Sequence, residues 1–126
     1  MWSIVNAVGS QAMRVANGYI TMNAGPEIGV ASTKAFTASM VDQYLLALYL
    51  GQLRGTLTIE QQHQYVQDIA RLPNLVGQTL ECDPLVEQLA GHLYQYRDFL
   101  YLGRGINYPI ALEGALKLKE ISYIHA

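Results

Sequence analysis

The sequence contains one cysteine, few charged residues and no long hydrophobic run. Cys82 has no partner for an internal disulfide, which suits a reducing compartment. The three histidines, His63, His92 and His125, lack the spacing of metal ligands, so we predict no metal site. Eight basic residues stand against ten acidic ones and form no basic run, so nothing favours a nucleic-acid partner.

No segment has the pattern of a membrane anchor. The longest apolar stretch, residues 44–50, is much shorter than the roughly 20 residues that a membrane helix needs. The N-terminus lacks the basic region and apolar core of a signal peptide. We therefore expect no membrane association and a cytoplasmic location.

The chain is nevertheless apolar for its size. Hydrophobic residues make up 51% and charged residues 14% of its 126 residues. Such a chain can form one modest domain with a core. The small share of charge predicts that much of its surface meets other protein, such as the rest of an α/β domain or a second subunit.

β-rich runs and helical patterns follow one another along the chain. Short strands are predicted at residues 3–8, 18–22 and 99–102. A helical turn is predicted at 11–16, and helices at 32–53, 59–72, 73–80, 83–96 and from 109 to the last residue. The order predicts a helix-rich α/β fold, with incomplete parallel-sheet elements in residues 1–55 and 99–126 joined by a helical segment, 56–98. Both ends look cut, so we expect a piece of a longer protein.

Two glycine-containing turns follow predicted strands. Residues 23–37, NAGPEIGVASTKAFT, lead into a helix, and such loops form ligand sites at the carboxyl ends of parallel strands. The turn Gly103-Arg104-Gly105 lacks the third glycine of a dinucleotide fingerprint, because residue 108 is tyrosine. By pattern alone, both are more often plain strand-to-helix connections than ligand sites.

The last predicted helix carries the clearest chemical signal. Glu113, Lys117 and Glu120 are spaced i, i+4 and i+7, which places them on one face, and apolar residues cover most of the remainder. A charged stripe on a largely apolar helix is either paired or functional. The spacing fits an intrahelical salt-bridge ladder as well as a carboxylate poised for proton transfer beside a lysine that tunes it or binds a sugar hydroxyl.

Two stretches resemble signatures of one family, the glutamine–fructose-6-phosphate aminotransferases, also called glucosamine-6-phosphate synthases. One is YPIALEGALKLKEISYIHA at residues 108–126, preceded by LGRG at 102–105, and the other is AGPEIGVASTKAFT at 24–37. The resemblance implies an internal piece of the family's isomerase region. Residues 1–55 would be the last part of a first sugar-isomerase (SIS) subdomain, and residues 99–126 the start of a second.

The resemblance also implies an activity and its residues. The family moves ammonia from glutamine to fructose 6-phosphate and isomerises the product to glucosamine 6-phosphate, in hexosamine biosynthesis, without a metal or organic cofactor. Val30, Ala31 and Ser32 match the segment that lines the sugar site. Glu120 matches the glutamate that moves a proton between sugar carbons, and Lys117 a lysine beside it.

The family's phosphate-binding loop, ring-opening histidine and imine-forming lysine match no residue of this chain. We therefore expect the isolated chain to be inactive. We also expect the complete protein to be a homo-oligomer, such as a dimer. Two alternatives stay open: a non-catalytic SIS-type module that binds sugar phosphates, and a segment that serves oligomerisation.

Overall fold

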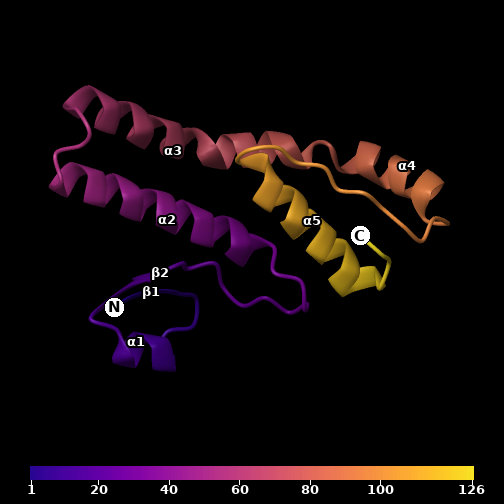
Figure 1. Ribbon diagram of the computed structural model, residues 1–126, viewed down its shortest axis with the longest axis horizontal. Helices are drawn as coiled ribbons and strands as arrows, with labels where there is room; N and C mark the ends of the chain where they lie inside the picture. Colours follow the sequence, from indigo (N-terminus) through magenta and orange to yellow (C-terminus); the bar gives the residue numbers. More distant parts are fainter. The chain divides into compact units, whose positions relative to one another are not determined.

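The computed structural model covers all 126 residues, and the chain divides into two compact units. One consists of Met1–Ile28 with Ser32–Leu75, and the other of Gly29–Ala31 with Val76–Ala126. Two strands and five helices follow one another as β1 (Trp2–Val5), α1 (Gln11–Val15), β2 (Gly18–Thr21), α2 (Lys34–Leu53), α3 (Ile59–Leu80), α4 (Asp83–Leu93) and α5 (Asn107–Ser122) (Figure 1). This is the predicted helix-rich α/β composition, and no helix has both the length and the apolarity to cross a membrane.

β1 and β2 form a two-stranded parallel sheet. Trp2 pairs with Gly18 and Val5 with Thr21, and the connection between the strands contains the short helix α1. The indole of Trp2 lies over Gly18, where an added Cβ would come within 3.2 Å of the ring. β1 ends three residues before the predicted limit, because the chain turns away after Val5 and Gly9 adopts a φ of 78°.

α2 and α3 lie side by side in opposite directions (Figure 1). The rings of Tyr44 and Tyr65 meet edge to face, with centroids 6.3 Å apart. A capping box starts α3, since the Thr58 amide donates to Gln61 Oε1 at 2.9 Å and the Gln61 amide donates to Thr58 Oγ1 at 3.2 Å. Thr33 is the N-cap of α2, which therefore begins two residues after the predicted start at residue 32.

The predicted break at Pro73 is wrong, because α3 runs through this residue to Leu80. A proline inside a helix removes one backbone donor and crowds one carbonyl, and the hydrogen bonds on either side can still carry the helix. α4 begins at Asp83, the predicted start, with Cys82 as N-cap, and it ends at Leu93 rather than at residue 96.

The predicted strand at residues 99–102 does not form. Only a parallel bridge between Asp98 and His125 occurs there, with the Phe99 amide donating to the His125 carbonyl at 2.8 Å. A strand needs a neighbour along several residues, and Leu100 and Leu102 are 92% and 90% exposed instead of buried. α5 also ends before the predicted limit, because Tyr123 adopts the left-handed conformation with a φ of 58°.

Candidate active site

α5 brings the three predicted charges into direct contact. The ammonium of Lys117 lies 3.1 Å from Glu113 Oε1 and 2.8 Å from Glu120 Oε2. About a quarter of each side chain is exposed, so the cluster is half-buried. The salt-bridge ladder expected from the i, i+4, i+7 spacing is therefore present, with the lysine between the two carboxylates.

The carboxylates keep the lysine charged. The hydrogen bond from Lys117 to Glu120 is the main cause that raises the pKa of the ammonium above its ordinary value of 10.5, and Glu113 adds to it. Partial burial acts in the opposite direction and is outweighed. At neutral pH the cluster thus presents a fixed ammonium rather than a neutral amine.

The glycine turn before α5 has a structural reason. A Cβ added to Gly103 would lie 2.4 Å from the Asn107 carbonyl oxygen, so the turn approaches the first residue of α5 more closely than other side chains allow. Gly105 has a φ of 58°, a conformation that suits glycine. The ring of Tyr101 lies against Gly114, where an added Cβ would come within 2.9 Å of it. These contacts fix the start of the helix that carries Glu113, Lys117 and Glu120.

The second predicted site lies in the loop before α2. Val30 is 88% exposed, and Ala31 and Ser32 are half-buried. Asn6, which follows β1, holds the first part of this loop. Its side-chain oxygen accepts from the Ala24 amide at 3.1 Å, and its side-chain amide donates to the Gly25 carbonyl at 2.6 Å.

Glu27, which was not predicted from the sequence, makes several bonds to the start of α2. Its Oε1 accepts hydrogen bonds from the Thr33 amide at 2.8 Å, the Thr33 hydroxyl at 3.2 Å and the Ala35 amide at 3.2 Å. The Thr33 amide is the main cause that lowers the pKa of Glu27 from 4.5 to about 2, followed by the Ala35 amide. The available signal was an acidic residue shortly before a helix whose first turn has none.

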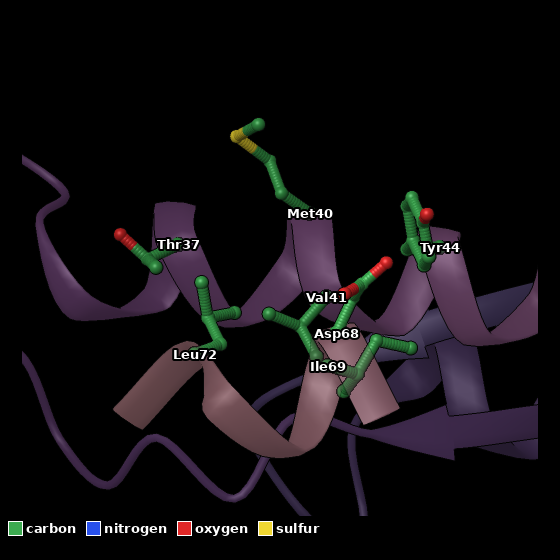
Figure 2. A pocket seen from close by; sticks show the side chains of 7 residues that line it. All are labelled: Thr37, Met40, Val41, Tyr44, Asp68, Ile69 and Leu72. Atoms are coloured by element: carbon green, nitrogen blue, oxygen red, sulfur yellow. The ribbon is translucent and has the colours of Figure 1, made fainter. Parts of the chain in front are cut away.

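The largely apolar pocket of the first unit contains none of these residues. It has a volume of about 300 Å³ and lies between α2 and α3 (Figure 2). Its lining is Thr37, Met40, Val41, Tyr44, Asp68, Ile69 and Leu72. No group of three or more histidine, cysteine, aspartate or glutamate side chains is arranged to hold a metal ion.

Comparison with other proteins places the chain in a family. A glutamine–fructose-6-phosphate aminotransferase (isomerizing) of Thermus thermophilus is 51% identical over 123 residues, which cover 98% of this chain and 20% of the relative. The enzymes of the same name from Bartonella quintana and Clostridium acetobutylicum are 49% and 45% identical over 124 residues. The chain belongs to the glutamine–fructose-6-phosphate aminotransferases, and it is homologous to one segment of them.

Structural comparison agrees with this assignment. The C-terminal domain of glucosamine-fructose-6-phosphate aminotransferase from Francisella tularensis superposes with a TM-score of 0.97 at 41% identity, over 99% of this chain and 35% of that one. No family model matches the sequence. The chain spans about one fifth of the length of its aminotransferase relatives.

Proposed function

We propose that this chain forms part of the fructose 6-phosphate site of an isomerizing aminotransferase that makes glucosamine 6-phosphate. The observation that carries the proposal is the cluster on α5, where one ammonium is held between two carboxylates on a half-buried helix face. This cluster lies within the segment homologous to enzymes named for fructose 6-phosphate. On this proposal residues 1–55 and 99–126 belong to two successive SIS subdomains, connected by residues 56–98.

In the proposed mechanism Glu120 is the base of the isomerisation. Once ammonia has replaced the oxygen at C2 of the ketose, a carboxylate can take a proton from C1 and return it to C2 through an enolamine, which leaves the nitrogen on C2 and an aldehyde at C1. Lys117 has three N–H donors, of which Glu113 and Glu120 engage two. The third can reach a sugar oxygen and stabilise the negative charge that develops there.

The raised pKa of Lys117 argues against this residue as the amine that forms an imine with the sugar. Forming an imine with a ketose requires a neutral amine, whereas Lys117 stays protonated at neutral pH. We therefore assign Lys117 an electrostatic role. Val30, Ala31 and Ser32 are proposed to contact the sugar, because they are partly accessible and offer backbone groups and one hydroxyl.

We further propose that the complete protein is cytoplasmic and a homo-oligomer, such as a dimer. The apolar surface supports the homo-oligomer. Val5 and Ala115, each 8% exposed, are the only buried apolar residues. Large apolar side chains such as Ile28, Leu100 and Ile106 are almost fully exposed. Such surface is normally covered by other protein. Light scattering of the complete protein tests this, and a monomer at high concentration would contradict it.

The activity is tested in a chimera. The matching segment of the Thermus thermophilus enzyme is replaced by these 126 residues, and glucosamine 6-phosphate formation from glutamine and fructose 6-phosphate is measured. We expect an active chimera, an inactive isolated chain, and about a 100-fold loss of kcat in Glu120→Gln. Glu87→Gln, on the exposed surface of α4, is the matched control and should change nothing. A chimera that binds fructose 6-phosphate without turnover would instead favour a non-catalytic sugar-phosphate module.

A further inference from the structure

The bonds of Glu27 replace a missing helix cap. The first turn of α2 contains no acidic residue, and its N-cap Thr33 makes no side-chain capping bond. The first amides of a helix have no partner within the helix and carry a partial positive charge. Glu27 meets this need from outside the helix, since it accepts from the amides of Thr33 and Ala35.

The same carboxylate engages the proposed sugar-binding loop. Glu27 accepts from both the amide and the hydroxyl of Thr33, the residue that follows Ser32. These two bonds fix the backbone directly after Ser32. The Ser32 side chain also contributes to the low pKa of Glu27, after the amides of Thr33 and Ala35.

Hydrogen bonds thus hold the chain on both sides of residues 28–32. Asn6 holds the chain before them through Ala24 and Gly25, and Glu27 binds the residues after them through Thr33 and Ala35. We propose that Glu27 is a positioning residue, which holds the start of α2 and presents Val30, Ala31 and Ser32 to the sugar. This inference rests on the proposed function of the loop.

The arrangement also orients the substrate. A helix N-terminus ordinarily attracts an anion, but here a fixed carboxylate already occupies the first amides of α2. A phosphate brought to the same amides would meet like charge. The loop therefore faces the hydroxyl-bearing part of the sugar phosphate, and the phosphate group lies elsewhere.

The test compares Glu27 variants in the active chimera. Glu27→Ala removes the bonds to Thr33 and Ala35 and should raise the KM for fructose 6-phosphate about tenfold, comparable to the loss of one helix cap, while kcat changes less than about twofold. Glu27→Gln keeps an acceptor oxygen without the charge and should give an intermediate KM. Because the pKa of Glu27 is about 2, the KM effect should be the same from about pH 6 to pH 9. Glu60→Gln removes the same charge from the first turn of α3 and should leave KM unchanged.

A second measurement uses the 126-residue chain itself. Hydrogen exchange at the Thr33 and Ala35 amides should become faster in Glu27→Ala, whereas the Gln61 amide, capped by Thr58, should exchange as before. An active chimera whose KM is the same in Glu27→Ala and Glu60→Gln would overturn the positioning role alone. An inactive parent chimera would overturn the proposed function and this inference together.

Discussion

Replacing Asp42 by asparagine is expected to stabilise the chain at neutral pH. Asp42 lies in the interior of α2 at 9% exposure and is the one buried charged residue. Its Oδ2 is completely buried and has no hydrogen-bond partner. One helical turn away on the same face are Ala38, Ser39 and Leu46, none of which can neutralise a carboxylate. Burial consequently raises the pKa of Asp42 above its ordinary value of 3.8.

The sign and size of the effect follow from this burial. Because the pKa is raised in the folded state, the folded chain binds more protons than the unfolded chain as the pH rises above 3.8. The free energy of unfolding therefore falls as the pH rises from 3.8 through the raised pKa of Asp42, and it stays lower at neutral pH. A buried polar group without a partner costs about 1–3 kcal/mol, and a charged one more. Asparagine carries no charge, so Asp42→Asn should be more stable by at least about 1 kcal/mol at pH 7 and nearly equal at about pH 3.

Urea denaturation followed by far-UV circular dichroism, from about pH 3 to pH 8, measures the difference in the free energy of unfolding between the variant and the unmodified chain. In thermal scans each kcal/mol of added stability corresponds to a rise of roughly 3–6 °C in Tm for a chain of this size. The matched control is Asp68→Asn in α3, where the exposed side chain accepts from Gln64 at 3.1 Å and the amide oxygen can do the same. Parallel pH profiles of the Asp42→Asn variant and the unmodified chain would refute the reasoning, as would a less stable variant at pH 7.

Three further predictions concern α3, the glycine turn and the α5 cluster. Pro73→Ala should restore a backbone donor inside α3 and raise stability by up to about 3 kcal/mol, seen as a higher Tm by circular dichroism. Gly103→Ala should destabilise by about 1–3 kcal/mol in urea, because its Cβ would lie 2.4 Å from the Asn107 carbonyl oxygen, whereas Gly91→Ala on α4 meets nothing and should stabilise by about 0.5–1 kcal/mol. In the chimera Lys117→Met should lower kcat about 100-fold, and Lys117→Arg, which keeps the charge, should retain more activity; equal kcat values for the two variants would exclude an electrostatic role.

The local parts of the fold could be predicted from the sequence. Helical geometry alone places residues four and three positions apart on one face, so the contacts of Lys117 with Glu113 and Glu120 follow from spacing. The end of α2 at Leu53 was also predicted, and it too is local, because Gly55 follows shortly after with a φ of 62°. Whether Glu120 and Lys117 act on a sugar stays a prediction.

The hydrogen bonds of Glu27 to the start of α2 could not be predicted by the same rules. Its partner Thr33 is six residues away and Ala35 eight, across a loop of irregular conformation. Familiar capping patterns connect residues within one helical turn of the helix start, and no periodicity governs a longer loop. Asp42 was predictable in part, because it is the only charge in the apolar middle of α2, but its lack of a partner depends on residues that other elements bring near it.

The two errors at Pro73 and at residues 99–102 share a physical cause. In a helix each hydrogen bond joins residues only a few positions apart. The residues on either side of Pro73 therefore keep their own bonds, and α3 continues although the proline removes one donor. In a strand every ladder bond comes from another segment, so apolar residues suffice only where a neighbour is supplied. Within this chain the neighbour is limited to His125, which explains why Leu100 and Leu102 remain exposed despite a strand-like pattern.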